Sequence, residues 1–346
     1  MDQPVKSQML TLIEQLSAPE PRAVEEALLS VLARDCESHF FFPFGSTQSV
    51  AAAADTFWRP LVAAFPHYEI RPGVILEGQY EGRRHASMLG FVSGNFLTPF
   101  AGVPPTKKLA HLRFGMNLVF QDGCAIGCFV MFDLIDLMDS AGIYPFRAMP
   151  GSPGQWLFPP IGREGKNRPD GQKTLAIIRE MQAGLPSGPA VVDRASAAAH
   201  HSPNWSETMN WFGPAGIGSS RGMAGFRDAH GALFLRAFQD RRGIPRGHGD
   251  DIARPGHFCE IGEGAFAMTG GWPNMIGTHA GAQWLGLPPT GREIRMRVAD
   301  WYRLDRFDRI ADNWVMIDIP HILDQMGMDV LAEIPFTTDP TLPRLP

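Results

Sequence analysis

The sequence has few cysteines, no cluster of basic residues and no long apolar run. Its 346 residues include four cysteines, too few and too scattered for a disulfide-stabilised scaffold. The net charge of -5 disfavours nucleic acid and anionic membranes as partners. No apolar stretch is long enough to span a bilayer, and the opening residues lack the features of a secretory signal. We therefore expect a cytoplasmic protein.

The sequence also lacks a clear metal-ligand pattern. Cys124 and Cys128 lie on one predicted strand without a second ligand pair at suitable spacing, so we interpret them as buried free thiols. The loop with His248 and Asp250, which precedes His257, is interpreted as solvated, with a metal site as the less favoured alternative. The sequence thus predicts no metal.

What the sequence does contain is an internal repeat. Residues 102–142 comprise a Gly-Val-Pro-Pro-Thr turn, a basic strand through Arg113, an Asp-Gly turn, a Val-Met-Phe-Asp segment and a short helix. Residues 286–327 comprise a Gly-Leu-Pro-Pro-Thr turn, a basic strand through Arg297, an Asp turn, a Val-Met-Ile-Asp segment and a helix. The landmarks are displaced by about the same interval, which indicates a tandem duplication.

Length and repeat together predict two domains. The expected parts are a first domain at 1–145, a Pro/Gly-rich linker with a short helix at 146–187, a second domain at 188–335 and a tail at 336–346. In each half, helices precede a series of strands, an order typical of the α+β class. The expected elements of the first half are helices at 5–16, 21–33 and 47–65 and strands at 68–77, 84–97, 107–120 and 124–132. Those of the second half are helices at 190–200 and 221–238, an aromatic segment at 205–212 and strands up to Asp318.

These motifs resemble the SnoaL-like polyketide cyclases of the nuclear transport factor 2-like (NTF2-like) superfamily, roughly over 20–145 and 188–330. The resemblance implies two tandem cone-shaped domains, each a curved antiparallel sheet wrapped by N-terminal helices around an apolar pocket. It also implies ring closure by aldol chemistry without metal or cofactor, with a pocket His and Asp. That His falls on Asp300 and Met116, and that Asp on Val315 and Val130, so neither half keeps the catalytic pair.

Strand alternation favours the second half as the active domain. Met296, Val298, Asp300 and Tyr302 share one face of a predicted strand, where Asp300 is the lone carboxyl among apolar neighbours. Desolvation should raise the pKa of Asp300 and suit it to proton transfer near neutral pH. The alternative is a buried Asp that Tyr302 or a backbone amide satisfies. The equivalent face of the first half carries no acid, so we expect the first domain to be non-catalytic.

Other residues of the second half are candidates with structural alternatives. Asn313 is either a donor to a developing oxyanion or a strand-end amide. His279 is a candidate second acid/base group, and His230 is either a core histidine or a substrate contact. Asp318 caps the following helix in the preferred interpretation and touches substrate at the pocket rim in the other. The residues predicted to bind substrate are Asp318, Met296, Val298, Val315, Ile317 and His230.

The sequence therefore predicts a cofactor-independent lyase or isomerase that acts on a small carbonyl compound. In this hypothesis Asp300 removes a proton alpha to the carbonyl, while Asn313 or Tyr302 holds the enolate oxygen. One alternative is a tandem module that binds small molecules without turnover, and another is a hydrolase or dehydratase that uses the same pocket. In each case the first domain would act as an intramolecular pseudo-dimer partner, and homo-oligomer formation stays open.

Overall fold

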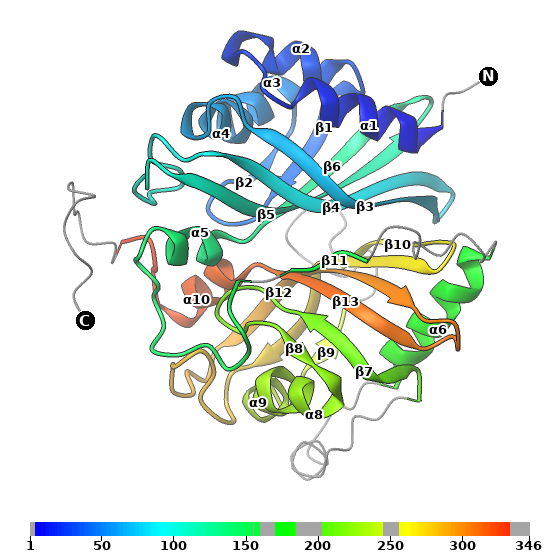
Figure 1. The fold of residues 1–346 in the computed structure, drawn as a ribbon, viewed down its shortest axis with the longest axis vertical. Coiled ribbons are helices and arrows are strands. Elements are labelled where there is room, and N and C mark those ends of the chain that lie inside the picture. Colours follow the sequence, from blue (N-terminus) through cyan, green and yellow to red (C-terminus); the bar gives the residue numbers. More distant parts are fainter. Residues whose placement is uncertain (1–3, 155, 160–169, 185–202, 245–255, 333–346) are drawn as a thin grey trace. The chain divides into compact units, whose positions relative to one another are not determined.

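The computed structural model describes residues 4–154, 156–159, 170–184, 203–244 and 256–332 (Figure 1). It divides the chain into two compact units, Met1–Pro145 with Met328–Pro346, and Phe146–Gly327. The expected helix at 190–200 and the residues His248 and Asp250 lie outside the described ranges. Across those ranges, none of the helices has the length and apolar character needed to cross a membrane.

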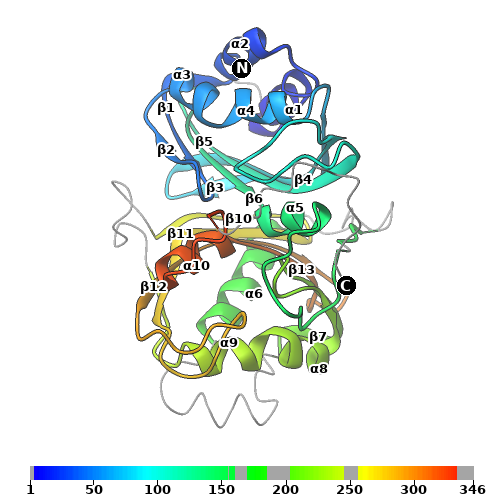
Figure 2. The same ribbon diagram turned by 90° about the vertical axis from the view of Figure 1, so that its left-hand side faces the viewer.

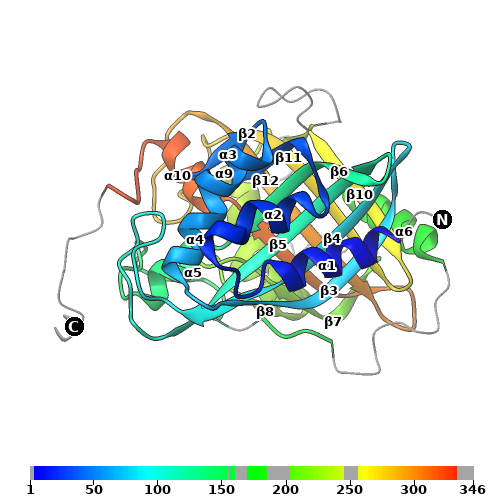
Figure 3. The same cartoon turned by 90° about the horizontal axis from the view of Figure 1, so that it is seen from above.

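The first unit is one curved sheet with its N-terminal helices over one face (Figure 3). The strand order is β2-β1-β6-β5-β4-β3, in which β1 and β6 are parallel and the other neighbours antiparallel. The strands are β1 (Leu32–Phe40), β2 (Gly45–Thr47), β3 (Glu69–Tyr80), β4 (Arg83–Asn95), β5 (Leu109–Gln121) and β6 (Cys124–Phe132). The helices are α1 (Val5–Gln15), a 3-10 turn (Pro21–Ala23), α2 (Val24–Leu29), α3 (Val50–Ala53), a π-helical turn (Ala54–Trp58), α4 (Arg59–Ala64) and α5 (Leu134–Ser140).

The second unit is also a curved sheet, with α6, α8 and α9 on one side of it (Figure 2). The strand order is β10-β11-β12-β13-β7-β8, β9 pairs with β11, and β13 and β7 are parallel. The strands are β7 (Trp205–Phe212), β8 (Ser220–Arg221), β9 (Arg242–Gly243), β10 (His257–Glu263), β11 (Phe266–Thr278), β12 (Glu293–Leu304) and β13 (Ile310–Ile317). The helices are α6 (Gly171–Ala183), α8 (Gly222–Phe226), a π-helical turn (Arg227–Gly231), α9 (Ala232–Ala237) and α10 (Ile319–Met326).

The two units have the same topology. The order β1-β6-β5-β4-β3 of the first sheet matches β7-β13-β12-β11-β10 of the second, and the parallel pair stands at the same place in both. The register also agrees, because Met116 pairs with Val130 as Asp300 pairs with Val315. The α+β class predicted from the sequence is therefore confirmed, since each unit combines a largely antiparallel sheet with separate helices.

The parallel strands were not predicted. The expected helix at 21–33 ends at Leu29, and β1 begins at Leu32, while the aromatic segment at 205–212 is β7. Neither segment alternates clearly between apolar and polar residues. Each becomes a strand because its backbone pairs with β6 or β13, which is a tertiary contact that local periodicity does not report.

The linker residue Trp156 is buried against the second unit, whereas Leu157 contacts that unit through its backbone carbonyl and has an exposed side chain. The indole nitrogen of Trp156 donates to the carbonyl of Gly213 at 3.0 Å, and the indole nitrogen of Trp314 donates to the carbonyl of Leu157 at 3.1 Å. The aromatic side chains of this linker thus belong to the packing of the second unit.

The four cysteines are free thiols, and Cys124 is half-buried rather than buried as expected.

Candidate active site

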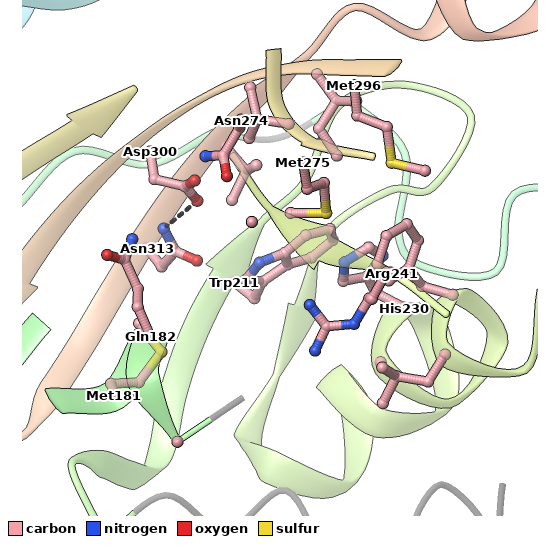
Figure 4. A pocket seen from close by; sticks show the side chains of 18 of the residues that line it. Met181, Gln182, Trp211, His230, Arg241, Asn274, Met275, Met296, Asp300 and Asn313 are labelled. Carbon is pink, nitrogen blue, oxygen red and sulfur yellow. Dashed lines mark hydrogen bonds between the residues drawn. The ribbon is translucent and has the colours of Figure 1, made fainter. Parts of the chain in front are cut away.

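A cavity of about 840 Å³ lies in the second unit, against the inner face of its sheet. Met296, Val298, Val315 and Ile317, the four apolar residues predicted from strand alternation, all line it. Aromatic side chains from the helices and β7, including Trp211, also line it (Figure 4). This mixture of an apolar wall with a few polar groups is typical of small-molecule sites.

Among the described residues, two carboxylic acids line this cavity, the exposed Glu180 and the half-buried Asp300. The side-chain amide of Asn313 donates to Asp300 Oδ1 at 3.2 Å, and the hydroxyl of Tyr302 also hydrogen-bonds to Asp300. Burial raises the pKa of Asp300 to about 7, while these two hydrogen bonds and the nearby His257 oppose the rise. Asp300 therefore titrates where a group can both take and give a proton at neutral pH.

Asn313 is placed to orient Asp300 rather than to hold an oxyanion. Its side-chain nitrogen donates both to Asp300 Oδ1 and to the backbone carbonyl of Trp301, the latter at 3.3 Å. The carbonyl can only accept, so it fixes which end of the Asn313 amide is the nitrogen. Both amide protons are then used, and the predicted role of Asn313 as an oxyanion donor is not supported.

Tyr302 has a similar supporting position. Its hydroxyl hydrogen-bonds to Asp300 and is contacted by the side chains of Gln182 and Thr269. Burial and the charge of Asp300 raise the pKa of Tyr302 well above its usual value, so the phenol stays protonated. Gln182 in turn donates to Thr269 at 2.9 Å. Tyr302 is thus held in a hydrogen-bond chain that ends at Asp300.

Two predicted site residues lie elsewhere. His279 follows β11 and does not line the cavity: its ring packs 5.4 Å from that of Phe238, and its Nε2 lies 3.2 Å from the carbonyl of Ala282. Asp318 caps α10 by accepting from the backbone nitrogen of His321 and pairs with Arg297 at 3.4 Å. The predictions that His279 is catalytic and that Asp318 binds substrate are therefore not supported by their placement.

His230 does line the cavity, and it is joined by residues that the sequence reasoning missed. Asn274 lies on the same side as Asp300 in Figure 4, whereas Arg241 lies near His230. Asn274 is 8% exposed, and within the described ranges its side-chain amide makes no hydrogen bond. One signal was available for Asn274, because Pro273 interrupts a predicted strand, and proline inside a strand marks a bulge.

The polar residues of the cavity replace apolar or aromatic residues of the first unit. The shared topology gives four equivalent positions, which are Asp300 and Met116, Asn313 and Cys128, His230 and Phe57, and Arg241 and Tyr68. Since the first unit builds the same fold without these groups, the fold does not require them. Their presence in one cavity indicates a functional site.

In the first unit, phenylalanine rings fill the equivalent interior. The ring of Phe57 lies 4.8 Å from that of Phe40, 5.2 Å from Phe44 and 5.5 Å from Phe132. Phe57 is completely buried. This aromatic cluster occupies the place at which the second unit has His230 and its cavity.

Within the described ranges, no group of three or more His, Cys, Asp or Glu side chains is placed to hold a metal ion. His257, the described member of the less favoured metal hypothesis, lies 2.6 Å from the carboxylate of Glu260 through its Nδ1. Glu260 in turn pairs with Arg179.

No family model and no curated protein matches the chain. Solved structures similar to parts of it include a candidate SnoaL-like polyketide cyclase from Jannaschia sp. CCS1, with 20% identity and a TM-score of 0.34 over 42% of this chain and 99% of that protein. IdmH from Streptomyces antibioticus, a candidate polyketide cyclase, has 18% identity and a TM-score of 0.31; the match covers 43% of this chain and 98% of IdmH. An NTF2-like protein from Burkholderia xenovorans LB400 has 12% identity and a TM-score of 0.30; the match covers 45% of this chain and 98% of that protein. These structures are described as candidate polyketide cyclases or NTF2-like proteins, the same groups that the sequence motifs resemble.

Proposed function

We propose that the cavity of the second unit catalyses a proton transfer on a small carbonyl compound, as a lyase or an isomerase, with Asp300 as the acid/base group. The observation that carries this proposal is the Asp300 carboxyl in a mainly apolar cavity, with a pKa near 7. Glu180, the other acid of the lining, is exposed. The same fold in the first unit places Met116 at the position of Asp300, so stability of the fold does not account for this buried acid. General acid/base groups are most effective when their pKa is near the working pH.

In the proposed step, the Asp300 carboxylate takes a proton from the carbon next to the carbonyl. The electron pair of that C–H bond forms the enolate, and its negative charge moves to the carbonyl oxygen. Protonated Asp300 then returns the proton to the substrate at another position, which leaves the enzyme unchanged. No outside oxidant or reductant is needed.

Asn274 is the proposed donor to the enolate oxygen. Both amide protons of Asn313 are already used, and the Tyr302 hydroxyl donates to Asp300. The Asn274 amide lies on the same side of the cavity as Asp300 (Figure 4). A side-chain amide in an apolar cavity stabilises a developing oxyanion strongly, because water does not compete for it.

Proton exchange in D2O tests the proposal without knowledge of the product. The purified chain is incubated with cyclic ketones, β-dicarbonyl compounds and keto-sugars, and loss of the signal of the hydrogen alpha to the carbonyl is followed by proton NMR. We expect exchange above the buffer rate for at least one class. If compounds bind, as judged by thermal shift, and none exchanges or changes, the cavity is a binding site without this chemistry.

The pH dependence of exchange follows from the state of Asp300. Only the carboxylate can take the proton, so the rate should rise with pH and level off above the pKa of about 7. A profile measured from pH 5 to pH 9 should have its midpoint near 7. A midpoint near 4, the usual range for a carboxyl, would contradict a desolvated Asp300.

Asn313→Leu should move this midpoint upward. The Asn313 hydrogen bond lowers the pKa of Asp300, so its removal leaves the carboxylate less stabilised. A hydrogen bond to a charged group contributes about 1.5–3 kcal/mol, which corresponds to a shift of roughly one to two pKa units. A lower plateau rate with an unchanged midpoint would instead assign Asn313 a purely structural role.

A further inference from the structure

The cavity has a second polar end. The residues at that end indicate which class of substrate the proposed reaction would use. Asp300, Asn313 and Asn274 lie on one side in Figure 4, while Arg241 and His230 lie together on the other, with Trp211 between the two groups. The charges that act on each end agree with this separation, because His257 acts on Asp300 and Arg241 acts on His230.

Arg241 brings a positive charge to the cavity wall. It follows the turn after α9, and its guanidinium carbon lies 5.8 Å from the centre of the Phe234 ring. Burial lowers the pKa of Arg241 to about 10, which still leaves the group charged at neutral pH. A guanidinium in these surroundings binds carboxylate well, because its planar N–H groups match the two carboxylate oxygens.

His230 adds a hydrogen-bond donor beside this charge. Its ring stacks on Trp211 at 4.4 Å, and burial with the charge of Arg241 lowers its pKa to about 3, so the ring is neutral at pH 7. Nδ1 is buried without a hydrogen-bond partner among the described residues. A neutral imidazole carries its proton on one nitrogen only, and leaving a buried acceptor unpaired loses less free energy than leaving a buried N–H unpaired. The proton is therefore assigned to Nε2, which can donate it to a ligand.

The first unit shows that the fold does not need either group. The turn after α4 holds Tyr68 as the turn after α9 holds Arg241, with the same backbone hydrogen bond to the residue three positions earlier. Gly94 lies against Tyr68, and Gly277 lies against Arg241 in the same way. At the π-helical turn, Phe57 occupies the place of His230. Helices with π-turns often carry functional residues at that point.

We propose that Arg241 and His230 form a subsite for a carboxylate, so that the substrate is a keto acid whose ketone lies at Asp300 and whose acid group lies at Arg241. This inference rests on the proposed function for the ketone end only. Placing the carboxylate at the far end keeps it away from the Asp300 carboxylate, which would otherwise repel it. Met275, Met296 and Val298 supply apolar wall for the carbon chain.

Matched pairs of ligands test the subsite by equilibrium binding, without turnover. Levulinate and benzoylpropionate are compared with their methyl esters by calorimetry on the full chain at pH 7.5. We expect the acids to bind at least tenfold more tightly than the esters. Arg241→Met should weaken acid binding by about 10- to 100-fold and leave ester binding within about twofold, since it removes a charge-assisted pair. Arg241→Lys should keep an intermediate preference.

Two further variants make the outcome decisive. His230→Phe introduces the residue that the first unit has at this place, and it should weaken acid binding by about 3- to 10-fold, the loss of one hydrogen bond. Asp300→Asn should keep the preference for the acid, which separates this inference from the catalytic one. Equal affinity for acid and ester, no measurable binding of either acid to the wild type, or an unchanged preference in Arg241→Met would each overturn the subsite.

Discussion

Asp300→Asn is expected to lower the rate of exchange alpha to the carbonyl by about 10²- to 10⁴-fold, the usual contribution of a general acid/base group. The amide keeps the shape of the carboxyl but can neither take nor return a proton. Ligand affinity should stay within a few-fold, because the cavity wall is unchanged. NMR exchange rates in D2O measure the first effect and calorimetry the second.

The same substitution should not destabilise the protein at neutral pH. Because burial raises the pKa of Asp300 from 3.8 to about 7 in the folded state, the folded protein binds a proton that the unfolded chain has lost between these values. Stability therefore falls as pH rises from about 4 to 7, by up to about 4 kcal/mol at 1.4 kcal/mol per pKa unit. Asp300→Asn removes this cost above pH 7.

Asp324→Asn is the matched control, because Asp324 is an exposed carboxyl on α10 of the same unit. It should leave both the exchange rate and the stability unchanged. A large loss of stability in Asp300→Asn with exchange at the wild-type rate would assign Asp300 to the structure of the unit and not to catalysis.

Phe57→Ala should destabilise the first unit by about 3–5 kcal/mol, the usual cost of removing a fully buried phenylalanine ring. Phe57 is the centre of the aromatic cluster that fills this unit, with Phe40, Phe44, Phe100 and Phe132 around it. Hydrogen exchange of peptides from β5 and β6, followed by mass spectrometry, reports the stability of this unit separately from the other.

Phe307→Ala is the control for the loss of an aromatic ring. Phe307 is 59% exposed, so its removal should change the free energy of unfolding little. The account also predicts that Phe57→Ala retains proton exchange at temperatures where the first unit stays folded. Loss of that activity in a folded Phe57→Ala protein would place catalytic function in the first unit, against the comparison of the two interiors.

The order of helices before strands in each half was sufficient to predict the fold class. The repeat predicted that both halves share one topology, because each landmark marks the same element in both. Strand alternation also placed Asp300, Met296, Val298, Val315 and Ile317 correctly on the cavity side of the sheet. A strand has one inner and one outer face, so parity within the strand decides the side once one residue is assigned.

Strand alternation could not predict the site residues that lie outside regular strands. Arg241 lies in a turn after α9 and Asn274 at a bulge in β11, where neither helical nor strand periodicity predicts which way a side chain points. His279 is equivalent to Phe96 of the first unit, because both rings pack on the phenylalanine that ends the preceding helix. This packing position in the core could not be read from the residue type alone.

The role of Asn313 depended on hydrogen bonds that the sequence does not contain. Its face was predicted correctly, yet its two amide protons are directed to Asp300 and to the Trp301 carbonyl. Side-chain partners of this kind are set by the register of β12 against β13, where Asn313 lies opposite Tyr302. A polar residue on the right face can therefore orient the reacting group instead of contacting the substrate.

The pKa of Asp300, measured directly, tests the central claim. Carbon-13 label in the aspartate carboxyls, with Asp300→Asn used to assign the resonance, gives a titration curve for this single group. We predict a midpoint near 7 in the free protein. A midpoint near 4 would show that Asp300 is an ordinary solvated carboxylate, and it would contradict the proposal that this cavity is an acid/base site.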